Sequence, residues 1–122
     1  MDEGVKLSWA EVLAYHRTLR GIGLRSLLVD QGESGYLNRF LPDGRILYSG
    51  EGRHGHQTLT PGNRRLLAAL EHQSTFRIFA RRAPNVWRDL GEYRVAQVEQ
   101  VEAERRRIYL FTLEPARLHR GP

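Results

Sequence analysis

The stretch Gly35–Asn63, GYLNRFLPDGRILYSGEGRHGHQTLTPGN, decides the fold. Two short extended runs in it carry two tyrosines twelve residues apart, Tyr36 and Tyr48. The segment Gly50–Gln57 after the second tyrosine is too rich in glycine to be a regular element. A helix is then predicted to begin at Thr60-Pro61, because threonine caps helices well and proline is tolerated in the first turn. Tyrosines beside glycines that let a ligand approach the backbone predict a site for a flat, hydrogen-bonding ligand.

The same stretch predicts a β-hairpin. The runs Tyr36–Leu41 and Arg45–Ser49 flank Pro42-Asp43-Gly44, a sequence typical of a tight turn. The helix that follows is expected to end near His72, with leucines of the segment 66–70 facing inward.

The chain before this stretch predicts one helix and one strand. Ser8 and Glu11 have the spacing of a capping box, and apolar residues then recur at helical spacing until Gly21. We therefore expect a helix from Ser8 to Gly21. Ile22–Val29 is largely apolar and predicts a strand, and Asp30–Gly35 predicts a loop.

The chain after the second helix predicts more strands. Three segments alternate apolar and polar residues, the pattern of half-buried strands: Phe76–Ala80, Tyr93–Val98 and Ile108–Leu113. We expect a loop over Arg81–Trp87 and a long polar connection over Glu99–Arg105.

These elements define an α+β fold with five or six strands, two helices and a mostly antiparallel, barrel-like sheet. The length of 122 residues suits one domain and not two, so we expect residues 1–122 to form a single domain. Residues 116–122 are expected to be a flexible tail.

The charge of the chain is informative. Formal net charge is +5, and eighteen of the nineteen cationic residues are arginine, Lys6 being the only lysine. The planar guanidinium suits bidentate bonds to phosphate and guanine, but arginine codons are also favoured in GC-rich genomes, so charge alone leaves nucleic-acid binding at even odds. The absence of cysteine fits a reducing compartment, and no apolar run reaches the roughly 18 residues of a membrane span, so no membrane partner is expected.

Patterns for catalysis or metal binding are weak. His54-Gly55-His56 supplies two histidines where zinc needs three or four ligands. Glu99, Glu102 and Glu104 are expected in a solvated connection beside arginines, and no nucleophile elbow is present. We therefore expect no metal, no cofactor and no catalytic residue. Two other classes stay open: a small enzyme on a related barrel, either a nucleoside hydrolase or a nuclease, that uses His54, His56 and Glu51, and an RNA-binding module.

Four short motifs occur in order and at compatible spacing. They are Tyr48-Ser49-Gly50-Glu51-Gly52, Gln57-Thr58-Leu59 with Asn63-Arg64-Arg65-Leu66, Phe76-Arg77-Ile78-Phe79, and Leu90-Gly91-Glu92-Tyr93-Arg94-Val95. Together they resemble the SRA (YDG) domain, which reads modified cytosine in eukaryotic methylation readers and in bacterial modification-dependent restriction endonucleases. The resemblance covers roughly residues 16–114.

The resemblance implies a PUA-like (SRA-type) twisted antiparallel β-barrel with two flanking helices, in which a base flipped out of DNA is held between two aromatic rings. By position these rings are Tyr36 and Tyr48, and Ser49 lies beside the base. The implied base pocket is Tyr36, Asn38, Arg39, Tyr48, Ser49, Gly50 and Glu51. The residues implied to hold the DNA backbone or groove are Arg53, His54, His56, Arg64, Arg81, Arg82 and Arg88.

The implied function is the binding of double-stranded DNA that contains modified cytosine, without catalysis by this chain. A nuclease partner would supply any cutting, and the resemblance implies a cytoplasmic, nucleoid-associated protein of a bacterium. The sequence departs from the family at three places. Tyr-Asp-Gly is replaced by Asp89-Leu90-Gly91, and the family's Asp-Gln is His56-Gln57 here. The family's aspartate that accepts from the cytosine amino group falls at Asn38-Arg39. Because Asn38 can accept through its amide oxygen and arginine cannot, the modification read stays open among 5-methylcytosine, 5-hydroxymethylcytosine and a bulkier derivative.

Overall fold

The computed structural model describes residues 5–116, which contain seven strands and two helices. In chain order these elements are β1 (Lys6–Leu7), α1 (Trp9–His16), β2 (Ser26–Val29), β3 (Arg39–Phe40), β4 (Ile46–Ser49), α2 (Pro61–His72), β5 (Thr75–Ala83), β6 (Val86–Ala103) and β7 (Arg106–Pro115).

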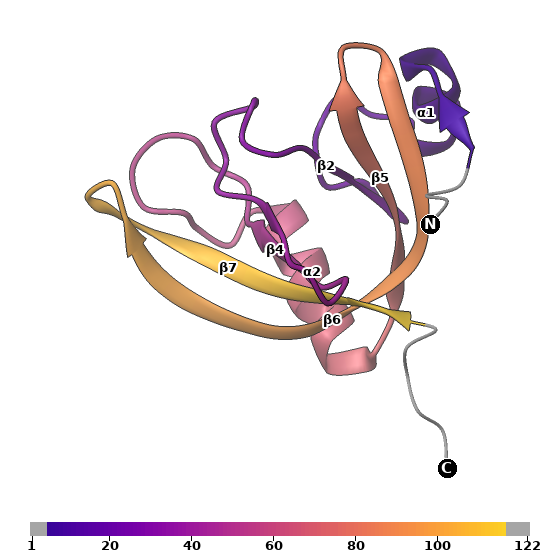
Figure 1. Cartoon of the computed structure of the whole chain (residues 1–122). Helices are drawn as coiled ribbons and strands as arrows, with labels where there is room; N and C mark the ends of the chain where they lie inside the picture. Colours follow the sequence, from indigo (N-terminus) through magenta and orange to yellow (C-terminus); the bar gives the residue numbers. More distant parts are fainter. Residues whose placement is uncertain (1–4, 117–122) are drawn as a thin grey trace.

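The strands form one mixed sheet in the order β2-β5-β6-β7-β4-β3, with β1 paired to β6. β2 and β5 are parallel, and the other pairs are antiparallel. β6 and β7 form a long ribbon that curves past α2, so the sheet curls into a half-barrel (Figure 1). The predicted α+β class with a mostly antiparallel curled sheet and two helices is confirmed.

The main core lies between the inner face of this sheet and α2. Leu66 of α2 packs with Ile78, Val95 and Phe111 of three neighbouring strands, and all four are buried. A smaller cluster beneath α1 joins Val12 to Phe79 and Trp87. Burying this apolar surface stabilises the curl and holds α2 against the strands that lead to the cavity described below.

Both helix starts agree with the sequence prediction, but α1 ends early. The Ser8–Glu11 capping box is present, and Thr60 caps α2 by accepting from Asn63 N. We expected the first helix to reach Gly21, and this is wrong. Arg17 adopts a left-handed conformation, with φ of 65°, and its N–H bonds to Leu13 O, which ends α1 at His16.

The chain between α1 and β2 is more irregular than predicted. The predicted strand Ile22–Val29 is regular only over Ser26–Val29, because Gly23 N donates to Ser26 O and turns the chain. In the predicted hairpin, β3 is shorter than Tyr36–Leu41, but it pairs antiparallel with β4, as expected.

Two predicted loops are strands. The loop expected over Arg81–Trp87 is a continuation of β5 and β6 that turns tightly at Pro84-Asn85, where Asn85 has φ of 59°. The long connection expected over Glu99–Arg105 is the end of β6 plus a two-residue turn at Glu104-Arg105, whose φ values are 51° and 68°. Two positive φ values make a turn that matches strand twist, so these polar residues form a tight hairpin. Of the predicted tail, residues 117–122 lie outside the described residues.

Candidate ligand pocket

A cavity of about 440 Å³ opens where three chain segments meet. They are the turn after α1 around residues 19–22, the chain from Leu28 to Asn38, and the stretch from Tyr48 to Arg53. Six of the seven residues predicted for a base pocket line it: Tyr36, Asn38, Tyr48, Ser49, Gly50 and Glu51. The seventh, Arg39, is exposed on β3 and is not among the residues that line the cavity.

Tyr36 lies half-buried at one side of the cavity. Its hydroxyl oxygen accepts a hydrogen bond from Gly52 N at 3.2 Å, which joins the two halves of the predicted stretch. The guanidinium carbon of Arg53 lies 5.3 Å from the centre of the Tyr36 ring, and Arg53 also lines the cavity. A planar cation therefore lies over the aromatic face.

Tyr48 is both a core residue and a cavity residue. It is 4% exposed, and its hydroxyl donates to Leu28 O at 3.1 Å. Burial raises the pKa of Tyr48, and the nearby Asp30, Tyr36 and Glu51 raise it further. Tyr48 is therefore a neutral phenol at physiological pH, fixed in place by the core on one side.

The chain from Ser49 to Gly52 forms one wall of the cavity. Ser49 N donates to Asn38 Oδ1 at 3.0 Å, and Gly50 N donates to Tyr109 O at 2.8 Å. A Cβ atom on Gly50 would lie 2.7 Å from Asn63 Oδ1, so only glycine fits here without displacing a buried amide.

Two buried amides hold this wall from behind. Gln57 donates to Gly50 O at 2.7 Å and to Gly52 O at 3.2 Å, while its Oε1 accepts from Tyr109 N at 2.9 Å. Asn63 has no exposed surface; it accepts from Glu51 N at 2.8 Å and donates to Glu51 O at 3.1 Å. The motif residues Gln57 and Asn63 therefore shape the cavity wall through its backbone.

Glu51 lies between this wall and α2. Its carboxylate accepts from Gly62 N at 3.2 Å, in the first turn of α2, where the helix dipole favours negative charge. A Cβ on Gly62 would lie 2.6 Å from that carboxylate, so the glycine leaves room for it.

The opposite side of the cavity carries Asp30 and Asn38. Asp30 accepts from Gly32 N at 3.1 Å and from Ser34 N at 3.0 Å. Asn38 Nδ2 lies 3.4 Å from Asp30 Oδ1. The sequence alone indicates no site role for Asp30. Its place before a glycine- and serine-rich loop indicates a turn. The sequence does not indicate that this turn faces Tyr36 and Tyr48.

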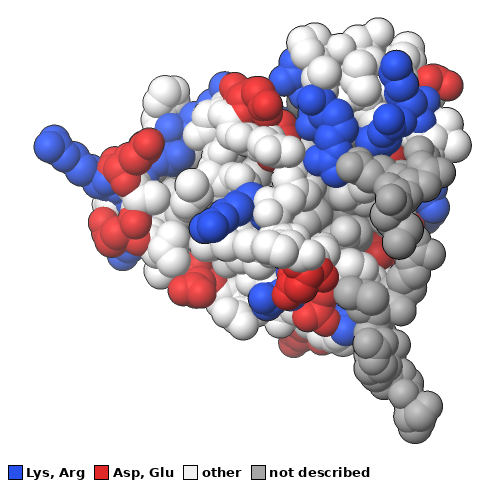
Figure 2. Space-filling view, viewed as in Figure 1, with Lys and Arg blue, Asp and Glu red and all other residues white. Residues whose placement is uncertain are grey.

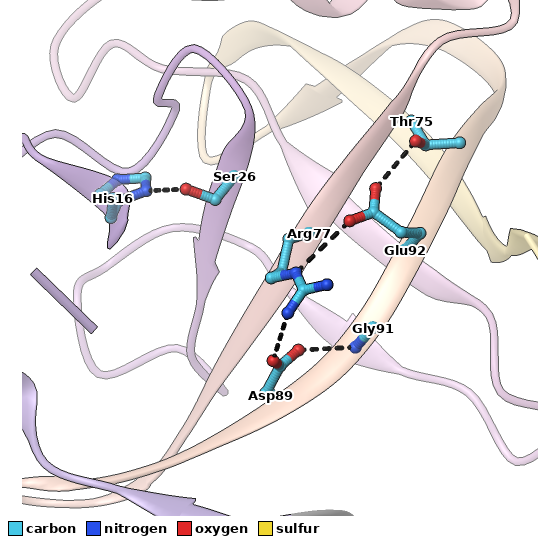
Figure 3. Close-up of polar contacts among 7 residues, drawn as sticks. All are labelled: His16, Ser26, Thr75, Arg77, Asp89, Gly91 and Glu92. Carbon is cyan, nitrogen blue, oxygen red and sulfur yellow. Dashed lines mark hydrogen bonds and ion pairs between the residues drawn. The ribbon is translucent and has the colours of Figure 1, made fainter. Parts of the chain in front are cut away.

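The turn that carries cavity residues Arg20 to Ile22 is held by buried His16. His16 Nε2 lies 2.6 Å from Arg20 O and must donate, so Nδ1 accepts from the Ser26 hydroxyl at 2.6 Å (Figure 3). Burial lowers the pKa of His16, and the bond to the Arg20 carbonyl offsets part of this effect. The role of His16 in the structure is therefore to position the turn.

This lowered pKa predicts a loss of stability in mild acid. Below about pH 6.5 the histidine of the unfolded chain takes up a proton that folded His16 resists, so the stability present above that pH falls as the pH drops toward the lower folded pKa. We expect the thermal unfolding midpoint to fall more between about pH 7.5 and about pH 5.5 in the wild type than in His16→Gln. His72→Gln, at the exposed end of α2, is the control, and equal pH dependence of wild type and His16→Gln would contradict the role of His16.

The residues predicted to hold DNA backbone or groove are dispersed. Arg53 lines the cavity, His54 is exposed in the adjoining loop, and His56 accepts from Arg107 N at 2.9 Å, which anchors that loop on β7. Arg64 is exposed on α2 and donates to Leu59 O.

The remaining predicted arginines lie on the β5–β6 hairpin. Arg81 and Arg82 are on β5, with the Arg82 guanidinium over the Phe40 ring, and Arg88 is on β6. Figure 2 shows basic side chains gathered on one face at the end of the molecule where α1 and the β5–β6 turn lie, whereas acidic side chains are more scattered.

The Asp89-Leu90-Gly91 segment, where the family signature falls, is structural. Asp89 binds Arg77 at 2.8 Å and accepts from Gly91 N at 2.9 Å, at a bulge in the β5–β6 ladder (Figure 3). Gly91 has φ of 87°, and Arg77 also reaches Glu92. These polar bonds fix the bulge that bends β6.

No group of three or more metal-binding side chains occurs within residues 5–116. In the same range, neither helix has the length and apolar character needed to span a membrane.

The half-barrel with two helices and a tyrosine-lined cavity defines a PUA-like domain of the SRA class. A family model of the ScoMcrA-like SRA domain matches residues 23–119, so the chain belongs to that family. The resemblance predicted from the motifs is confirmed. No curated protein matches the chain.

Solved structures share the fold at low sequence identity. The KRYPTONITE complex with mCHG DNA and SAH superposes with a TM-score of 0.77 at 20% identity, covering 93% of this chain and 32% of that one. The SRA domain of SUVH5 with methylated CHH DNA gives 0.77 at 17% identity, covering 93% and 88%. The modification-dependent restriction endonuclease TagI gives 0.75 at 21% identity, covering 93% and 49%. This chain therefore covers about a third of the KRYPTONITE chain and about half of the TagI chain.

Proposed function

We propose that this protein recognises modified cytosine in double-stranded DNA by taking the flipped base into the cavity between Tyr36 and Tyr48. The observation that carries the proposal is the lining of this cavity. It combines two aromatic rings, those of Tyr36 and Tyr48, with the polar side chains of Asp30, Asn38 and Ser49. Stacking on aromatic rings and hydrogen bonds to the base edge offset the free energy of extruding the base from the duplex, which is roughly a few kcal/mol.

Related structures support this choice of ligand. Domains of the same fold are solved with methylated DNA and with fully hydroxymethylated CG DNA. The SRA domain of ScoMcrA, together with a sulfur-binding domain, is solved with phosphorothioated DNA. We propose that residues 1–122 act as one recognition domain and that a nuclease on another polypeptide acts after binding, in the bacterial cytoplasm at the nucleoid.

The roles of the cavity residues follow from their contacts. Tyr36 offers a half-buried ring for stacking, and the core-fixed Tyr48 bounds the other side of the space. Ser49 and Gly50 form the wall beside the base, and Glu51 ties that wall to α2. Arg53, at the rim over Tyr36, is the arginine best placed to meet the phosphate of the flipped nucleotide. Arg81, Arg82 and Arg88 supply positive charge on the β5–β6 hairpin.

The test is fluorescence anisotropy with duplexes that carry cytosine, 5-methylcytosine or 5-hydroxymethylcytosine at a single position. We expect the protein to bind at least one modified duplex more tightly than the unmodified one at moderate salt. Equal affinity for all three would overturn the proposal. Competition with single-stranded RNA is measured in parallel, and tighter binding of the RNA would place the protein among RNA-binding modules instead.

Arg53→Ala is expected to weaken binding to modified and unmodified duplexes by the same factor. Loss of one phosphate contact lowers the slope of log affinity against log salt by about one. Anisotropy titrations over a range of salt concentrations measure that slope. Arg45→Ala is the matched control, since Arg45 is exposed and paired with Asp43 at the hairpin turn, and an unchanged slope in Arg53→Ala would contradict phosphate contact.

A further inference from the structure

We infer that Asp30, at the end of β2, accepts the hydrogen bond from the cytosine amino group, and that Asn38 donates to the neighbouring ring nitrogen. The inference rests on the proposed function and names the residues that decide which base the cavity takes. It moves the acceptor away from the Asn38-Arg39 position that the sequence resemblance indicates.

Asn38 is turned the wrong way to be the acceptor. Its amide oxygen already accepts from Ser49 N at 3.0 Å, and this bond directs the NH₂ group toward Asp30. Because Ser49 N–H can only donate, the orientation of the amide is set by the backbone of β4. Arg39 is exposed on β3 and cannot accept at all.

Among the described residues that line the cavity, the carboxylates are Asp30 and Glu51. Glu51 is directed to the first turn of α2 by its bond with Gly62 N, and its backbone is fixed on both sides by Asn63. Asp30 is the carboxylate that stands next to an amide donor.

The Asp30 carboxylate has acceptor capacity left. It accepts from two backbone N–H groups, those of Gly32 and Ser34, and its contact with Asn38 Nδ2 is long at 3.4 Å. A carboxylate offers about four lone-pair sites, so Asp30 can accept from a ligand while its turn stays intact. The same backbone bonds hold the carboxylate in one orientation, which favours directional recognition.

The pair presents an acceptor beside a donor, which is complementary to cytosine and opposed to thymine. Cytosine carries an amino donor at position 4 and an acceptor at N3, whereas thymine carries an oxygen acceptor at position 4 and an N–H at N3. 5-Methylcytosine and thymine both have the 5-methyl group, so only this edge separates them. Thymine would face Asp30 with an oxygen and Asn38 with a second donor, and both contacts are repulsive.

The experiment compares two duplexes that differ at one base, 5-methylcytosine or thymine, each opposite guanine. Wild type, Asp30→Asn and Glu33→Gln are titrated with both duplexes by anisotropy. Glu33 is the matched control, because it is an exposed carboxylate in the same loop and does not line the cavity. Because extrusion of each base costs the same in all three proteins, the change in the ratio of affinities isolates the protein contact. We expect Asp30→Asn to reduce the preference for 5-methylcytosine over thymine about tenfold or more, and Glu33→Gln to leave it within about threefold of wild type.

A preference that survives Asp30→Asn would overturn the inference, as would an equal loss in Glu33→Gln. A merely structural role of Asp30 would lower affinity for both duplexes and leave the ratio unchanged. If Asp30→Asn does not fold, as judged by circular dichroism, wild type is titrated with a duplex carrying 5-methylpyrimidin-2-one, which lacks the amino group. Equal affinity for that base and 5-methylcytosine would then overturn the inference, while failure of the wild type to prefer any modified duplex would count against the proposed function itself.

Discussion

Asn63→Ala is expected to lower the free energy of unfolding by about 3 to 5 kcal/mol, because the change leaves several buried backbone groups without partners. The Asn63 side chain bonds to both the N–H and the carbonyl of Glu51 and to Thr58 O, and none of its surface is exposed. Alanine removes all three bonds in a region closed to water. Urea unfolding followed by circular dichroism measures the change.

Arg64→Ala is the matched control, one residue further along α2 with an exposed side chain. It should change the unfolding free energy by no more than about 0.5 kcal/mol. If Asn63→Ala were as mild as Arg64→Ala, Asn63 would not be the residue that holds the cavity wall. Asn63 does not line the cavity, but it holds the backbone of the cavity wall at Glu51. An Asn63→Ala protein that still folds should therefore also bind modified DNA more weakly.

Tyr36→Ala is expected to remove most of the preference for modified DNA. Stacking of a base on an aromatic ring contributes about 1 to 3 kcal/mol, which corresponds to a loss of about five- to 150-fold in affinity for the modified duplex. Binding to unmodified duplex depends on phosphate contacts and should change little. Anisotropy with both duplexes at one salt concentration gives the two affinities.

Leu37→Ala is the control, since Leu37 is the neighbouring residue and is 55% exposed. Tyr36 is a sharper probe than Tyr48, which is buried in the core and would leave a destabilising void if truncated to alanine. Unaltered preference in Tyr36→Ala would show that its ring packs against the protein and not against a base.

Much of the fold could be predicted because local signals agree with the tertiary structure. Ser8 and Thr60 each have a capping hydroxyl at the right distance from an apolar stripe, and the Pro-Asp-Gly turn sets the β3–β4 pairing. Three of the errors arise where a positive φ falls on a residue other than glycine. Arg17, Asn85 and Glu104-Arg105 adopt such angles, so the chain turns sharply where the sequence resembles a continued helix or a loose loop.

The cavity could be predicted only in part. Tyr36 lies just before β3 and Tyr48 lies on β4, the partner strand, so their spacing in the sequence brings them to one place. Asp30 follows β2, which reaches the cavity where the Tyr48 hydroxyl donates to Leu28 O, a long-range contact that spacing does not encode. Asn38 was predicted as a cavity residue, but its amide orientation depends on a hydrogen bond from Ser49 that only the folded hairpin supplies.

The anchoring of the glycine-rich loop has a consequence for protein engineering. One end is fixed at Gly52, whose carbonyl accepts from Gln57 and, at 2.6 Å, from Arg106. The other end is fixed where His56 accepts from Arg107 N of β7. Arg53 and His54, between these ends, are exposed. The fixed ends belong to the scaffold, and the position at the tip that is free of the cavity is His54. New sequences or longer insertions placed at His54 would alter the outer surface beside the cavity, while Arg53 stays over the Tyr36 ring in the cavity lining.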